Sequence, residues 1–304
     1  MLGAVCLACL PILAYASPFS FGVIAHTAVA TPDDAVLREA IAATDADNLA
    51  FVVVNGIKAS EETCSDQLFT RRKTLFERAK NGLILSVAAS DWSGCRAENG
   101  QSLAIERLNH VRELFFGNDF SFGATKLPIT RQGRIPKFRA YAENLRWDID
   151  RLVFATVNLP ANNNDFIYDA GRNSEFEDRM IANRAWLHRL FTSAVHRNAA
   201  GIVLFVDGNP LAVTQPKPSS GAYRDGFAEI RKNIQQLAQQ FDGKIMLVHG
   251  QDPSNPVFAN IITWQGNIAS LHPSTGWQKI TVDDASPMLF RVSAAPSLAK
   301  AALP

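Results

Sequence analysis

The first 32 residues of the chain contain no aspartate, glutamate, lysine or arginine. Met1 to Ala16 is mostly apolar and ends in Ala14-Tyr15-Ala16, a small-residue pattern typical of a signal-peptidase site. The basic residues that usually open a signal peptide are missing. We predict a cleaved signal peptide over residues 1–16, and two alternatives stay open: a buried first strand and an uncleaved membrane anchor. No later stretch reaches the roughly 20 continuous apolar residues of a membrane span.

An excess of charge of either sign is also lacking. The 304 residues carry 30 basic and 29 acidic side chains, which gives a formal net charge of +1, and no block of like charges is present. This balance argues against a nucleic-acid partner and against a broad attraction to anionic lipid, although it allows a small local basic patch. With 47% hydrophobic residues, the chain can bury a sizeable core and is not a disordered polypeptide.

Cysteine is scarce. Of the four cysteines, Cys6 and Cys9 lie in the predicted signal peptide, so the mature chain keeps Cys64 and Cys95. Two cysteines in an exported protein predict one disulfide, closing a loop of about 30 residues. The alternative is two unpaired thiols, as a cytosolic location requires. The signal peptide and the disulfide together predict a periplasmic or secreted protein, free of the membrane once the signal is cleaved.

Short runs rich in β-branched and aromatic residues alternate with amphipathic stretches. The predicted strands are 19–25, 49–54, 83–88, 152–159, 201–206 and 244–249, mostly apolar on both faces, as in the middle of a layered fold. The runs 260–264 and 288–292 resemble half-buried strands of a second sheet. Apolar stripes predict helices over 104–115, 176–194 and 227–241, and another after Thr31-Pro32, with Asp33 and Asp34 at its positive end. This order predicts one α/β domain over residues 17–304.

Polar residues follow most of the predicted strands. In α/β sheets, ligands bind outside the carboxyl ends of the strands, so these positions define a candidate binding cleft. Its members are His26, Asn55, Ser90, Asp91, Asn163, Asp207, Gln251 and Asp252.

Several segments carry a family resemblance. They are FGVIAHT (21–27), VVVNGIKASEETCSD (52–66), ASDWSGC (89–95), ERLNHVRELFF (106–116), RAYAENLRW (139–147), NNNDF (162–166) and EFEDRMIANRAWL (175–187). They resemble the calcineurin-like metallophosphoesterases, most closely a secreted bacterial branch of that superfamily, over roughly residues 19–292. The resemblance implies an α/β fold, a metallophosphoesterase-like sandwich of two mixed β-sheets flanked by helices. It also implies a strand-end centre where two metal ions activate water for phosphoester hydrolysis.

Most of the metal-binding residues of that family are replaced in this chain. By resemblance, His26 replaces the aspartate of the first strand end, and Gly56 replaces the aspartate that bridges both metals. Ser90 replaces an asparagine beside Asp91, and the later aspartate and histidine become Gln251 and Pro253, while His249 keeps its place. A structural zinc site contributes on the order of 10–16 kcal/mol, or about 3–4 kcal/mol per ligand, so these losses remove most of the affinity. We therefore predict a non-catalytic homologue without a cofactor, whose polar cleft binds a small ligand or a protein.

Two catalytic alternatives stay open. His26, Asp91, His249 and Asp252 supply the ligand types for a single zinc or manganese ion. That site would make the chain a residual or altered metal-dependent phosphoester hydrolase, with Asp91, His26 and His249 as candidate catalytic residues. The alternative interpretation is that the histidines are hydrogen-bonded at strand ends and the acids cap loops. A serine hydrolase built on Ser90 and Asp91 is disfavoured, because no Gly-x-Ser-x-Gly elbow surrounds Ser90. The run Asn162-Asn163-Asn164 is more typical of a turn than of a binding site.

Overall fold

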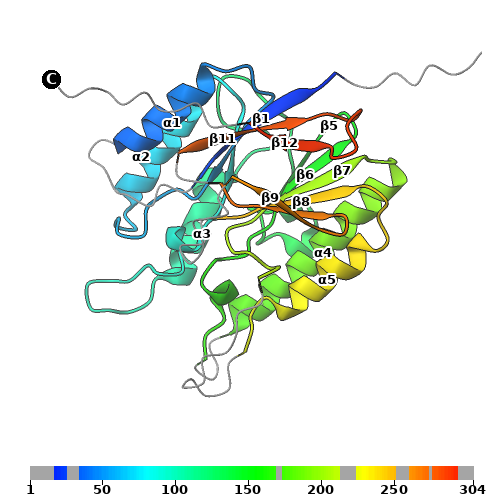
Figure 1. Ribbon diagram of the computed structural model, residues 1–304. Coiled ribbons are helices and arrows are strands. Elements are labelled where there is room, and N and C mark those ends of the chain that lie inside the picture. The colour runs from blue at the N-terminus through cyan, green and yellow to red at the C-terminus, as the bar shows by residue number, and fades with distance from the viewer. Residues whose placement is uncertain are drawn as a thin grey trace, which may run out of the picture.

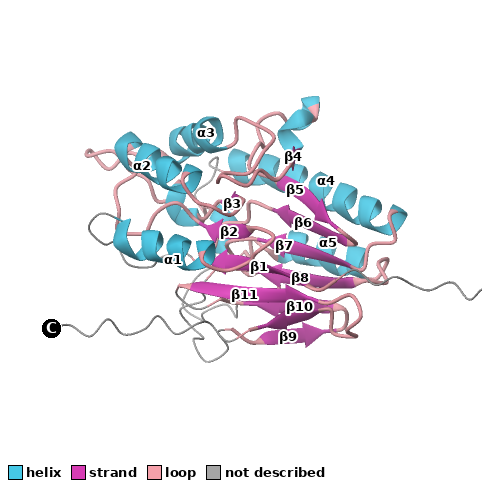
Figure 2. Cartoon of the chain, turned by 90° about the horizontal axis from the view of Figure 1, so that it is seen from above, coloured by secondary structure: helices cyan, strands magenta, loops and turns pink. Residues whose placement is uncertain are grey.

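The computed structural model describes residues 17–25, 34–168, 173–212, 224–250, 260–273 and 276–293. In these ranges two mixed β-sheets face each other, and helices flank them (Figures 1 and 2). This architecture confirms the predicted α/β sandwich of two mixed sheets. The predicted signal peptide, residues 1–16, lies outside the described residues. No helix within the described ranges is both long and apolar enough to cross a bilayer.

The first sheet has five strands in the order β12-β11-β1-β2-β3. Three parallel strands, β1 (Phe19–Ile24), β2 (Val52–Asn55) and β3 (Leu83–Ser86), form one side of it. The antiparallel strands β11 (Trp277–Val282) and β12 (Phe290–Val292) complete the other side. Helices α1 (Ala35–Asp45), α2 (Asp66–Glu77) and α3 (Ala104–Phe115) place their apolar side chains in the same core cluster as this sheet.

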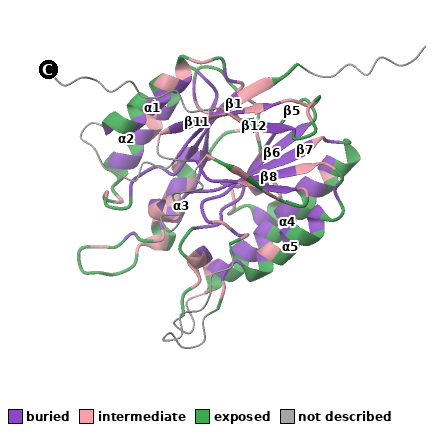
Figure 3. Cartoon of the chain, in the orientation of Figure 1, coloured by how far each residue is buried: buried purple, intermediate pink, exposed green. Residues whose placement is uncertain are grey.

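The second sheet has seven strands in the order β4-β5-β6-β7-β8-β10-β9. Its parallel centre consists of β6 (Leu152–Thr156), β7 (Gly201–Phe205), β8 (Lys244–Val248) and β10 (Ile268–Leu271). The antiparallel strands β4 (Thr130–Arg131), β5 (Leu145–Ile149) and β9 (Ile262–Gln265) lie at its two ends. Helices α4 (Ser174–His196) and α5 (Ala228–Ala238) pack on the face turned away from the first sheet, and their outer sides are exposed (Figure 3).

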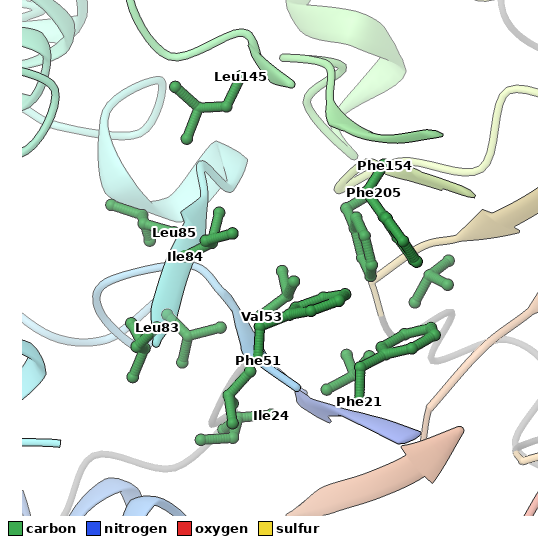
Figure 4. Close-up of a cluster of buried hydrophobic side chains, with 14 of the residues drawn as sticks. Phe21, Ile24, Phe51, Val53, Leu83, Ile84, Leu85, Leu145, Phe154 and Phe205 are labelled. Carbon is green, nitrogen blue, oxygen red and sulfur yellow. The ribbon is translucent and has the colours of Figure 1, made fainter. Parts of the chain in front are cut away.

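Aromatic rings fill the space between the two sheets (Figure 4). Phe21 and Phe51 come from the first sheet, and Phe154 and Phe205 come from the second; all four are fully buried. The ring centroids of Phe51 and Phe154 lie 4.9 Å apart, and those of Phe21 and Phe205 lie 5.9 Å apart, with edge-to-face geometry. Each such ring contributes about 1.5–3 kcal/mol by burial, so these contacts hold the sheets face to face.

One expectation about the elements was wrong. The late strands do not share a sheet, because β9 ends the seven-stranded sheet and β12 ends the five-stranded one. Asp34 stands at the positive end of α1, as expected, but its side chain makes no capping hydrogen bond. It is buried, has a φ of 57°, and forms ion pairs with Arg71 and Arg72 of α2. The buried carboxylate is attracted more strongly by the full charges of two guanidinium groups, one of them the buried Arg72, than by the partial charge of a helix end. Thr31 and Asp33 lie outside the described residues.

The predicted disulfide is present. Cys64, just before α2, is bonded to Cys95, which follows β3, and their Cα atoms lie 5.8 Å apart. The bond therefore ties the loop after β2 to the loop after β3, at the carboxyl ends of two neighbouring strands.

We predict that the double change Cys64→Ser and Cys95→Ser lowers the free energy of unfolding by about 3–4 kcal/mol, because the disulfide closes a loop with a sequence separation of 31. Urea denaturation at neutral pH measures this. Wild-type protein treated with a reductant is the matched control and should show the same loss. Equal stability of oxidised wild type and the double variant would contradict the prediction.

Candidate functional site

Asp91 occupies the centre of the strand-end region. It closes a short 3₁₀ turn, Ala89–Asp91, directly after β3, and its side chain has no exposed surface. Its Oδ1 accepts hydrogen bonds from the backbone N–H groups of Ile57 at 2.7 Å and Lys58 at 3.2 Å. Its Oδ2 accepts one from the N–H of Ala88 at 2.8 Å. The carboxylate therefore joins the loop after β2 to the loop after β3.

Asp207 performs a similar role at the end of β7. Its Oδ2 accepts hydrogen bonds from the N–H groups of Ala89 at 2.7 Å and Ala161 at 2.8 Å. Its backbone carbonyl accepts the N–H of Gly250, which follows β8. The bond to Ala89 crosses from one sheet to the other, so this single residue connects the loops after β3, β6 and β8.

Two glycines permit close approach here. A Cβ atom on Gly250 would lie 2.7 Å from the carbonyl oxygen of Asp207 and 2.9 Å from Nδ2 of Asn55, so no larger residue fits without displacing them. Gly56 is buried at the end of β2 and has a φ of 84°, the left-handed region that glycine adopts freely. In the predicted resemblance, this position corresponds to the bridging aspartate, and glycine offers no side chain there.

His249 is held by two neighbours at the end of β8. Its Nδ1 lies 3.0 Å from the carbonyl oxygen of Gly250, and its Nε2 lies 3.0 Å from Oγ of Ser270. The ring also contacts His272 edge to face, with centroids 5.5 Å apart. Since His249 is 5% exposed and both nitrogens face protein oxygens, it fits the interpretation of a hydrogen-bonded strand-end histidine.

The structure brings together only part of the predicted cleft. Asn55, Asp91 and Asp207 lie in one connected cluster, and Ser90 joins its edge through a hydrogen bond from Oγ to the Lys58 carbonyl. Asn163 belongs elsewhere, because its side chain bonds to the backbone of Arg224 and Gly226 before α5. His26, Gln251 and Asp252 lie outside the described residues.

The predicted turn at Asn162-Asn163-Asn164 is confirmed. Asn163, Asn164 and Asp165 all have φ values between 53° and 55°, a left-handed conformation that asparagine and aspartate tolerate better than most residues. Trp92, Trp147 and Trp186 are buried, as expected of packing anchors.

The hollow at the described strand ends is too small for a ligand larger than a water molecule. A hollow lined by Ala25, Asn55, Ser86, His249 and Gly250 has a volume of about 10 Å³. This is about the space that one water molecule needs. The described residues therefore form a packed polar junction at this edge.

Burial dominates the electrostatics of the junction. It raises the pKa of Asp91 from 3.8 to about 7; the three backbone N–H groups oppose this rise, and the neighbouring charge of Asp207 adds to it. Burial also raises the pKa of Asp207, against hydrogen bonds from Ala89, Ala161 and Asn55. The buried ammonium of Lys58 has its pKa lowered by burial, although Asp91 and Glu62 attract its charge. Its Nζ donates to the carbonyl oxygens of Ala59 and Glu62.

A second buried polar network escaped the sequence analysis. Arg179 of α4 has no exposed surface and donates to Oδ1 of Asn164 at 2.6 Å and to the Asn158 carbonyl at 3.3 Å. It thereby holds the loop after β6, which carries Ala161. A signal was present in the sequence: Arg179 and Asn183 interrupt the apolar stripe of the predicted helix, and a polar residue on a buried face needs a partner.

The described donors do not match the metal centre that the resemblance implies. Metal ligands must direct free lone pairs toward a common point, whereas the carboxylates of Asp91 and Asp207 face backbone N–H groups. In the described part of the chain, no three histidine, cysteine or acidic side chains are grouped so that they could hold an ion.

A scan against protein-family models and a search of curated proteins found no match to this chain. The likeness to the calcineurin-like metallophosphoesterases therefore stays a prediction from its sequence segments.

We predict that Asp91→Asn flattens the pH dependence of stability. Because the pKa of the folded form lies above the unfolded value, the folded chain keeps a proton that the unfolded chain releases. This group therefore lowers the free energy of unfolding as pH rises from about 4 to about 7, by on the order of 3–4 kcal/mol. Urea denaturation across that range measures the difference between variant and wild type. Asp178→Asn, an exposed acid on α4, is the control that should keep the wild-type profile; parallel profiles for Asp91→Asn and wild type would contradict the assignment.

A second prediction concerns the backbone at Gly56. Gly56→Ala should lower the free energy of unfolding by about 1–2 kcal/mol, because a Cβ is strained at positive φ. Gly94→Ala is the control, since Gly94 is exposed and a Cβ there meets no atom within 4 Å. Thermal unfolding compares the two variants, and equal shifts in Tm would show that Gly56 carries no special constraint.

Proposed function

We propose that the chain is an exported, non-catalytic homologue of the calcineurin-like metallophosphoesterases that acts by binding a small ligand or a protein. The observation that carries this proposal is the use of the strand-end acids. Asp91 and Asp207 direct their oxygens at backbone N–H groups of other loops, so they act as structural braces. Hydrolysis of a phosphoester by this fold would need carboxylates that face a metal ion and its activated water.

Gly56 supports the same conclusion. The bridging ligand of a two-metal centre must carry an anionic side chain, and glycine has none.

The hydrolase alternative needs a rearrangement of the junction. A single-metal site made of His26, Asp91, His249 and Asp252 would have to use Asp91 in a fully buried position, where backbone N–H groups already occupy both its oxygens. Each such hydrogen bond that an ion displaced would leave a buried N–H group unpaired, at a cost of about 1–3 kcal/mol. The observed hydrogen bonds favour the non-catalytic proposal.

The disulfide supports export. A bond between Cys64 and Cys95 forms and persists in an oxidising compartment. The apolar first 16 residues support it too, and we propose a periplasmic or extracellular location.

Metal analysis and turnover test this proposal together. The full chain, purified without chelator and incubated with zinc or manganese, should hold no stoichiometric metal and should not hydrolyse p-nitrophenyl phosphate or bis-p-nitrophenyl phosphate. Asp91→Asn and His249→Gln serve as matched controls for a contaminating phosphatase, because contaminant activity would be equal in all three preparations. Metal-dependent turnover that is present in wild type and lost in both variants would overturn the proposal.

A further inference from the structure

A groove of about 520 Å³ lies between the second half of α4 and the end of the seven-stranded sheet formed by β4 and β5. Figure 2 shows α4 beside these two strands, and Figure 3 shows the exposed outer side of the helix. The polar side chains that line it are Thr130, Arg146, His188, Arg189, Thr192, Ser193 and His196. We call it the α4–β5 groove.

Strand pairing and helix periodicity place these side chains on common faces. Thr130 and Arg146 are directly paired across β4 and β5, so their side chains stand on the same face of the sheet. Arg189, Ser193 and His196 follow one another at spacings of four and three residues, so they share one face of α4. Trp186, one turn before Arg189, is buried at the floor of the groove.

The lining of the groove carries cations and hydroxyl groups but no acid. Arg146 bonds to Asp148, yet the same carboxylate also pairs with Arg197, so one negative charge is shared by two guanidinium groups. Arg189 is exposed and has no ion pair or hydrogen bond from its side chain within the described residues. The α4–β5 groove is therefore a local positive site on a chain whose net charge is only +1.

We propose that the α4–β5 groove binds the phosphate group of an anionic ligand. A guanidinium group offers paired N–H donors that match two phosphate oxygens, and Arg189 can present such a pair without breaking an existing bond. Thr130, Thr192 and Ser193 supply hydroxyl donors for the remaining oxygens. A short groove with few cations fits one phosphate group better than the extended backbone of a nucleic acid.

The site is separate from the strand-end junction. Its residues come from β4, β5 and α4, and none of them contacts Asp91 or Asp207 through a described hydrogen bond. Binding at the groove therefore does not depend on whether the strand ends are catalytic. The phosphate group belongs either to a soluble compound or to a lipid headgroup, and these two sources need separate measurements.

The test uses the full chain labelled with fluorotryptophan and followed by fluorine NMR, with the Trp186 signal assigned from Trp186→Phe. Inorganic phosphate is the soluble probe, and phosphatidylcholine vesicles with and without phosphatidic acid are the lipid probe. We expect saturable binding in one of these arms that shifts the Trp186 signal, and about tenfold weaker binding in Arg189→Gln.

Arg184→Gln is the matched control, because Arg184 is another exposed arginine of α4 and its partner is Glu229 of α5. Binding that falls in Arg189→Gln and stays unchanged in Arg184→Gln supports the α4–β5 groove, and the arm that shows it identifies the source of the phosphate. Equal losses in both variants would mean non-specific attraction and would overturn the proposal, as would the absence of saturable binding in both arms.

Discussion

Two buried carboxylates tie together the strand ends of both sheets, and the arrangement of that whole edge depends on them. Asp91 accepts three backbone N–H groups from the loops after β2 and β3, and Asp207 accepts two from the loops after β3 and β6. Loops that leave parallel strands carry unpaired N–H groups, and a buried acceptor must satisfy them. The disulfide between Cys64 and Cys95 closes the same edge covalently.

This use of acids explains why the edge resembles an active site without the geometry of one. Both carboxylates are buried and their pKa values are raised, a feature that often marks catalytic groups. Burial shifts the pKa values of structural carboxylates in the same way. A catalytic or metal-binding carboxylate differs from a structural one in the direction of its lone pairs. Here the lone pairs point at backbone donors, and the pKa values are raised because both carboxyl groups are buried, against the effect of those donors.

Charge that could meet a ligand lies elsewhere in the described structure. The buried arginines Arg72 and Arg179 donate to internal acceptors such as Asp34, Glu62 and Asn164. Arg189 in the α4–β5 groove differs, because it is exposed and faces other donors. The strand-end polar groups thus stabilise the fold. The cationic α4–β5 groove lies beside α4, on the side of the second sheet that faces away from the first sheet.

The sequence by itself determined the alternation of buried strands and amphipathic helices, the pairing of the two cysteines that follow the signal segment, and the turn at Asn162-Asn163-Asn164. The strands, helices and turn follow from apolar periodicity and backbone preference, which act over a few residues. The pairing of the cysteines follows from their number, because only two of them come after the predicted cleavage point. The tertiary structure alone decided that β9 and β12 end different sheets, that Asp34 meets Arg71 and Arg72, and that Asp91 and Asp207 face N–H groups. A sequence shows which residues carry polar atoms but not which donors reach them, because two of the three partners of Asp91 lie more than 30 residues away and those of Asp207 lie more than 40 away.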